Sequence, residues 1–181
     1  MSAKTLLKSL LAYQAWANDE LLETLVGLDP SRGAAERHAA IRLMNHIHVV
    51  SRIFAAHLRG VAPGYAGDNT PDTPEPRALR AALVEVDRWY RPSRNHFGAG
   101  TCRADRFTFT DGDKGCMTRQ EMLTHVVLHG GYHRGEVGRM LAGIAVSPPW
   151  DTYAVHLHRV EPARCLQGEC KSIGMAGGPR I

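Results

Sequence analysis

Apolar residues recur at the spacing of a helical face along most of this chain. The first such segment runs from Leu6 to Leu28 and ends at the turn-forming residues Asp29-Pro30-Ser31. A second segment covers about Ala34 to Arg59. A third should end or kink at Pro92. The inward positions of this third helix are Leu79, Leu83, Val86 and Tyr90. The pattern therefore predicts three long amphipathic helices in the first half of the chain.

The period changes between Cys102 and Thr118. Phe107-Thr108-Phe109-Thr110 alternates apolar and polar residues, as a strand with one buried face does. Asp111-Gly112-Asp113-Lys114-Gly115 follows and is rich in turn-forming residues. We predict a small β-hairpin here. A short helix or extended segment near Tyr153 to Val160 closes the domain.

A fourth long helix begins after the hairpin. Thr118 and Glu121 have the T-x-x-E spacing of a capping box, and the periodic segment then runs to about Ala145. Four long helices predict an all-α fold, a four-helix bundle with a small β-hairpin before the fourth long helix. The Gly- and Pro-rich segment 60–76 predicts a long surface loop and a crossover connection. We predict one bundle domain over residues 1–160 and a partly disordered Gly-rich tail over 161–181.

Composition indicates an ordinary globular protein. The chain has 181 residues, 44% of them hydrophobic and 22% charged, with a formal net charge of +4. The basic residues form no cluster, so no nucleic-acid partner is expected. No apolar stretch is long enough to span a membrane, no signal peptide is evident, and we expect a cytoplasmic protein. The cysteines, which form no CxxC pair, favour reduced thiols, with a Cys165–Cys170 disulfide left open; they are Cys102, Cys116, Cys165 and Cys170.

Histidines on the fourth helix are the first sign of chemistry. At 100° per residue, the apolar positions of this helix fall within a sector of roughly 60°. His129 and His133 lie inside that sector, one turn apart, whereas His125 lies at its edge beside Glu136. The apolar positions are Met122, Val126, Val137, Met140 and Ile144. Two histidines are therefore expected to point into the bundle, with His125 and Glu136 at the rim.

Two inward imidazoles need partners for their nitrogens, and one metal ion can satisfy both. On the second helix, His46 shares the stripe of Leu43, Ile47 and Val50, which makes it the candidate third ligand. His57 returns to the same face but lies about 16 Å further along the axis. Hydrogen-bonded core histidines without a metal remain the alternative. His48 is displaced from that stripe by about 200° and faces elsewhere. The remaining histidines are interpreted as surface residues; they are His38, His96, His156 and His158.

The combination resembles the DinB/YfiT-like family of helical-bundle metalloenzymes. The resemblance covers most of residues 5–160, and the H-x3-H-R-G run and the Asn-His pair of the second helix carry it most specifically. The matching stretches are LLAYQAWANDELL (10–22), MNHIHVVSRIF (44–54), FTFTDGDKGCMTRQEML (107–123), HVVLHGGYHRGEVGRML (125–141) and SPPWD (147–151). It implies a divalent metal bound near one end of the bundle by His46, His129 and His133, and a homodimer. Family members often have Gln where this chain has Glu136.

The resemblance also implies a function. Some relatives are transferases or isomerases that depend on a low-molecular-weight thiol. The leading expectation is therefore a metal-dependent enzyme with a small-molecule substrate, specifically a low-molecular-weight-thiol S-transferase in which the metal stabilises the thiolate. Hydrolysis is a second expected chemistry. Zinc and nickel are the favoured ions and iron also suits imidazole ligands. The competing hypothesis is a non-catalytic, metal-stabilised dimeric protein of stress response or interaction, in which the ion serves folding.

Overall fold

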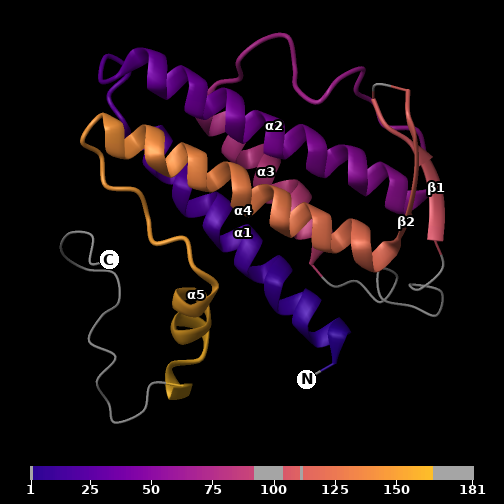
Figure 1. The fold of residues 1–181 in the computed structure, drawn as a ribbon. Helices are drawn as coiled ribbons and strands as arrows, with labels where there is room; N and C mark the ends of the chain where they lie inside the picture. Colours follow the sequence, from indigo (N-terminus) through magenta and orange to yellow (C-terminus); the bar gives the residue numbers. More distant parts are fainter. Residues whose placement is uncertain (1, 92–103, 111, 165–181) are drawn as a thin grey trace.

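The computed structural model describes residues 2–91, 104–110 and 112–164 of the chain (Figure 1). These residues form five α-helices and one two-stranded sheet. In chain order the elements are α1 (Ala3–Gly27), α2 (Ala34–Arg59), α3 (Pro76–Tyr90), β1 (Ala104–Thr108), β2 (Lys114–Thr118), α4 (Arg119–Gly143), α5 (Tyr153–Val160) and a 3-10 turn at Pro162–Arg164. The predicted all-α fold with a hairpin before the fourth long helix is confirmed. Cys102, Pro92 and the predicted tail beyond residue 164 lie outside the described residues.

The sequence signals at the helix ends act as expected. Thr118 accepts from the amide of Glu121, and the Glu121 carboxylate accepts from the amide of Thr118, which completes the predicted capping box of α4. Gly60 ends α2 in the left-handed conformation, at a φ of 70° that an L side chain rarely adopts. α3 begins at Pro76, whose missing amide hydrogen is no loss in the first helical turn. Local chemistry therefore sets where the bundle helices begin and end.

The bundle is wired with a crossover, as predicted. α2 packs mainly on α4 and α3, and α1 packs mainly on α3 and α4, so α1 and α2 are diagonal neighbours. After α2 the chain runs back along that helix before α3 begins (Figure 1). The Arg42 guanidinium fixes this return by donating to the carbonyls of Thr70 and Asp72, at 2.6 Å and 3.0 Å. α2 and α3 are consequently parallel, whereas α4 runs antiparallel to α2.

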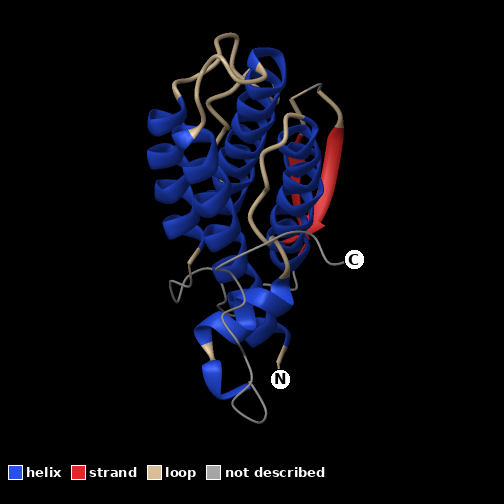
Figure 2. Cartoon of the chain, turned by 90° about the vertical axis from the view of Figure 1, so that its left-hand side faces the viewer, coloured by secondary structure: helices blue, strands red, loops and turns tan. Residues whose placement is uncertain are grey.

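The hairpin lies alongside the helices rather than inside the bundle, as Figure 2 shows. β1 and β2 pair antiparallel, with Ala104 opposite Thr118 and Thr108 opposite Lys114. The first strand begins earlier than the alternating residues indicated and ends at Thr108. Phe107 is buried, with its ring centroid 6.0 Å from that of Phe54 on α2. One aromatic side chain thus attaches the hairpin to the bundle.

Two apolar clusters fill the bundle, one toward each end, and a buried polar layer separates them. In this layer the Arg134 guanidinium donates to Gln14 Oε1 at 2.8 Å and Asn18 Oδ1 at 3.0 Å. It also donates to Asp151 Oδ2 at 2.7 Å, while Asn18 Nδ2 donates to Asp87 Oδ2 at 2.9 Å. A buried charge is tolerated only with such partners. The layer therefore links α1, α3 and α4 at the mid-length of the bundle.

The interpretation of His156 as a surface residue is wrong. α5 packs against α1, and the His156 ring lies 6.0 Å from the Tyr13 ring and 5.4 Å from the Trp16 ring, measured between centroids. Its side chain is buried, and its Nδ1 has no hydrogen-bond partner among the described residues. Burial lowers the pKa of His156 from its ordinary value, with the Arg91 charge as a smaller cause.

Within the described part of the chain, no helix carries a stretch long and apolar enough to cross a membrane.

Candidate metal centre

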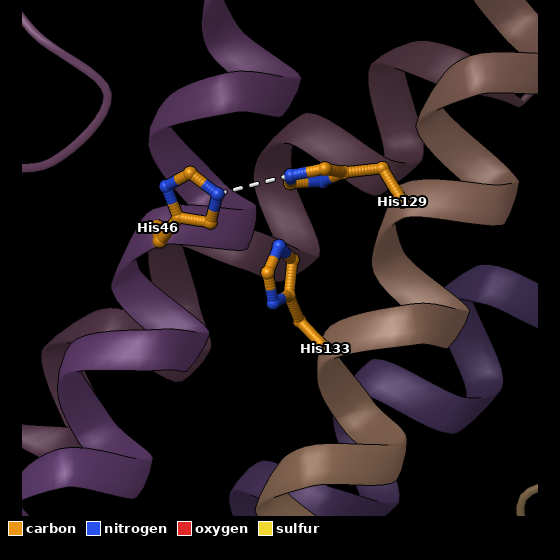
Figure 3. Close-up of side chains that lie close together, drawn as sticks. All are labelled: His46, His129 and His133. Carbon is orange, nitrogen blue, oxygen red and sulfur yellow. Dashed lines mark hydrogen bonds between the residues drawn. The ribbon is translucent and has the colours of Figure 1, made fainter.

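Three histidine side chains converge at the interface of α2 and α4 (Figure 3). His46 projects from the middle of α2, and His129 and His133 project from successive turns of α4. The Nε2 atoms of His46 and His129 are 3.0 Å apart, and one ring nitrogen from each histidine lies within 4.8 Å of the other two. The predicted trio is therefore brought together by the fold.

The site lies at the mid-length of both helices, so the position near one end that the resemblance implied is wrong. The reason is the arrangement of the helices. α2 and α4 have nearly equal lengths and pack antiparallel, so their central residues meet. The side chains are also not in the centre of the core. His46 and His133 each keep 17% of their side-chain surface exposed, which leaves the site open toward solvent.

Two hydrogen bonds fix the orientation of two of these rings. His46 Nδ1 lies 2.8 Å from the backbone carbonyl oxygen of Asp68, and a carbonyl only accepts, so Nδ1 carries the proton. His133 Nδ1 lies 2.8 Å from Glu136 Oε2, where the carboxylate is the acceptor. In each neutral ring the lone pair is then on Nε2, the nitrogen that faces the shared space. Such outer partners are typical of metal-binding histidines.

His129 is neutral over the whole physiological range. Burial is the main cause that lowers its pKa to about 3, and the neighbouring imidazoles of His133, His46 and His125 lower it further. Because His46 Nε2 bears a lone pair, the 3.0 Å contact is a hydrogen bond only if His129 Nε2 carries its proton. A cation between the two nitrogens would instead require the proton to be on His129 Nδ1.

The other histidines near α2 and α4 do not join this group. His125 stacks on His129 with ring centroids 5.4 Å apart, and its ring lies tilted against that of Phe54 at 4.5 Å, so it is a neighbour of the site, as its place on the helix indicated. His57 contacts Phe54 and Phe107, toward the hairpin. Glu136 contacts His133 only through the Nδ1 hydrogen bond described above.

The donor set fits a divalent metal ion. Zinc lies about 2.0–2.1 Å from each imidazole nitrogen, which places tetrahedral ligand nitrogens about 3.4 Å apart. The Nε2 atoms of His46 and His129 are 3.0 Å apart and no separation within the group exceeds 4.8 Å, so the observed separations bracket that value. Among the described residues, no fourth His, Cys, Asp or Glu side chain completes the group. The three histidines are thus positioned to hold a metal ion and to leave coordination positions free.

Packing on the opposite face of α4 holds two of the histidines in place. Gly130 follows His129, and a Cβ atom there would lie 2.4 Å from Gln14 Nε2, so glycine permits the close approach of α4 to α1. Arg134 follows His133, and its hydrogen bonds in the polar layer resist rotation of the helix. Arg134 and Asp68 are neighbours of the site that were not predicted from the sequence.

Comparison with known proteins identifies the family of the chain. The sequence model of the DinB family matches residues 1–164. A search of curated proteins found no match, and neither did a search of solved structures. The matched segment spans every described helix and all three converging histidines. The chain belongs to the DinB family.

Proposed function

We propose that this DinB-family protein binds one divalent metal ion through His46, His129 and His133 and is a metal-dependent enzyme. The observation that carries the proposal is an incomplete coordination sphere: three imidazole nitrogens face one point, and no fourth protein ligand is present among the described residues. Structural zinc sites are closed by four protein ligands, whereas catalytic sites keep a position for water or substrate.

The chain's own residues prepare the site for this role. Asp68 and Glu136 hold His46 and His133 with Nε2 directed inward, and burial keeps His129 neutral. A divalent ion held there would lower the pKa of a water or thiol group bound to it. Zinc and nickel are the ions we favour, with iron as a third candidate, because imidazole ligands suit all three.

We further propose that the substrate class is a low-molecular-weight thiol and that the reaction is an S-transfer. The thiol loses its S–H proton, its sulfur forms a bond to an electrophilic carbon of a small acceptor molecule, and the group displaced from that carbon leaves with the bonding electrons. Two considerations support this. Family membership is one, since thiol-dependent chemistry occurs among DinB proteins. The other is the open, three-nitrogen site, because zinc and nickel bind thiolate sulfur readily. Location in the cytoplasm, where thiols are kept reduced, is part of the same proposal.

Metal binding is tested first. Purified protein is offered zinc and nickel, and bound metal is measured by elemental analysis after gel filtration. We expect one ion per chain in the wild type and none in His129→Ala. His57→Ala is the matched control, since its ring lies away from the trio. Absence of stoichiometric metal in the wild type would refute the proposal.

Turnover is tested second, with a panel of small thiols and an electrophilic acceptor. We expect metal-dependent consumption of the thiol by the wild type and background rates for His129→Ala. No turnover across the panel, combined with loss of the folded state in the metal-free protein, would instead favour the non-catalytic, metal-stabilised role.

A homodimer is also proposed. Leu128 and Tyr132 lie one turn apart on α4 and are 68% and 69% exposed, as apolar side chains at a subunit contact would be in an isolated chain. Light scattering gives the mass directly, and Leu128→Glu should shift a dimer toward the monomer. A wild-type protein with the mass of one chain would contradict this part of the proposal.

A further inference from the structure

The crossover loop after α2 is attached to the helix at the level of the histidines. Arg42 donates to two loop carbonyls, and Asn69 Nδ2 donates back to the Arg42 carbonyl oxygen at 3.0 Å. Asn45 Nδ2 donates to Asn69 Oδ1 and, at 2.6 Å, to Thr70 Oγ1. We call these four residues, Arg42, Asn45, Asn69 and Thr70, the loop clasp.

Asn45 is the unusual member of the loop clasp. It is only 2% exposed, on a helix whose other buried residues are almost all apolar. Burying an amide costs free energy unless it is hydrogen-bonded, and an apolar residue of similar size would fill the same space without that requirement. Its two donated hydrogen bonds both go to the loop. The role of Asn45 is therefore to hold the loop rather than to fill the core.

The position of the loop matters because Asp68 immediately precedes Asn69. The Asp68 carbonyl oxygen accepts the hydrogen bond from His46 Nδ1, and it is a backbone atom of an otherwise exposed loop residue. The position of the Asp68 carbonyl depends on the backbone of the residues that flank it. On the C-terminal side that residue is Asn69, which is held by its hydrogen bonds to Asn45 and Arg42. The loop clasp thus connects a buried amide on α2, through two loop residues, to the imidazole of the adjacent His46.

We propose that Asn45 and Asn69 are positioning residues for the metal centre: through the loop clasp they hold the Asp68 carbonyl against His46 and keep its Nε2 directed at the ion. This inference rests on the proposed metal binding. Loss of an outer hydrogen-bond partner of a ligand histidine costs about 10- to 100-fold in metal affinity. The coupling is reciprocal, so the bound ion must also stabilise the loop over residues 66–72.

Zinc affinity, measured by competition with a chromophoric chelator, tests whether Asn45 and Asn69 position the metal centre. Asn45→Leu keeps a side chain that is branched at Cγ but removes both donated hydrogen bonds, and Asn69→Ala removes the amide side chain by which the loop contacts α2. We expect each variant to bind zinc about 10- to 100-fold more weakly than the wild type. Val61→Ala, at an exposed position of the same loop, is the matched control and should bind as the wild type does.

A purely structural role is distinguished by stability. The urea midpoint of metal-free Asn45→Leu should stay close to that of the metal-free wild type even though its zinc affinity falls. The reason is that Asn69 Oδ1 still accepts from the Thr70 amide and Thr70 Oγ1 still donates to the Asp72 carbonyl, so neither loop group is left without a partner. Amide hydrogen exchange tests whether the bound ion stabilises the loop. Zinc should slow the exchange of residues 66–72 in the wild type, and should slow it less in Asn69→Ala.

The outcomes separate this inference from the function on which it rests. If the wild type binds neither zinc nor nickel, both the metal centre and the positioning role are overturned. If the wild type binds zinc and both loop-clasp variants bind within twofold of it, the metal centre stands and the positioning role is overturned. Exchange rates in the loop that zinc leaves unchanged would overturn the coupling as well.

Discussion

Asp87 should make the stability of this protein fall as the pH rises from acid to neutral. Its carboxyl group is almost fully buried in the polar layer, and burial raises its pKa from 3.8 to about 6. The hydrogen bond from Asn18 and the charge of Arg134 lower the pKa and only partly offset the burial. In the unfolded chain the same carboxyl ionises near its ordinary pKa, so the folded state binds the proton more tightly.

The magnitude follows from that difference in proton affinity. Below about pH 4 the group is protonated in both states, and its contribution to stability is fully present. Between about pH 4 and pH 6 the unfolded state ionises first, and stability is lost with rising pH. Each tenfold difference in proton affinity is worth about 1.4 kcal/mol, so the full loss is about 3 kcal/mol above pH 6.

Asp87→Asn isolates this contribution, because an amide resembles the protonated carboxyl and can still accept the hydrogen bond from Asn18. Urea denaturation, followed by circular dichroism at pH steps from about 4 to 7.5, gives the free energy of unfolding of the wild type and of the variant at each pH. The variant should match the wild type at about pH 4 and exceed it by about 3 kcal/mol at neutral pH. Other titrating groups cancel in the difference. A difference that stays constant over this pH range would refute the reasoning.

Three further predictions concern neighbouring parts of the bundle. Gly130→Ala should destabilise the fold by about 1–3 kcal/mol in urea denaturation, because the new methyl group displaces the hydrogen-bonded Gln14; an unchanged midpoint would contradict the close packing. Glu136→Ala should weaken zinc binding about 10-fold or more in chelator competition. Glu136→Gln can still accept from His133 and should keep most of the wild-type zinc affinity. Equal zinc affinities of Glu136→Ala and the wild type would exclude an orienting role for Glu136. His156→Leu should gain stability relative to the wild type as the pH falls from about 7 to 5, because burial lowers the pKa of this histidine and its protonation favours unfolding; parallel pH profiles would argue against that burial.

Much of the fold was predictable because it depends on local patterns. The segment Ala34–Arg59 and the capping box at Thr118 give the ends of two helices directly, and the inward residues of α3 are all buried. Helical periodicity and capping are properties of a few neighbouring residues, which is why the sequence alone reveals them. The crossover was indicated by loop length, although the side of the bundle on which the loop returns was not.

The apolar sector assigned to α4 was too narrow. Leu123, Val127 and Leu141 are also buried, and including them turns the centre of the buried face by roughly 40°. With the wider face, Arg134 falls inside the buried sector and His129 lies toward its edge, which is the observed arrangement. The sequence therefore contained a signal for the buried arginine.

Other neighbours of the site gave no such signal. The His46 ring is held by the backbone carbonyl of Asp68, and any residue type can supply that carbonyl.

Away from the metal centre, His156 was predicted to be a surface residue because the contact of the short helix α5 with α1 depends on the path of the preceding loop. Long-range contacts of this kind are made by tertiary structure and have no local pattern.

The pairing of α2 with α4 has a consequence for the synthesis of the protein. His46 and His129 are separated by 83 positions in the chain, and the hairpin and all of α3 are made between them. A nascent chain that ends before α4 carries only one of the three proposed ligands. Under the proposed function, all three ligands meet only after the last long helix has packed against α2. An ion bound by the complete trio therefore reports that α4 has docked, on the ribosome or during refolding in vitro.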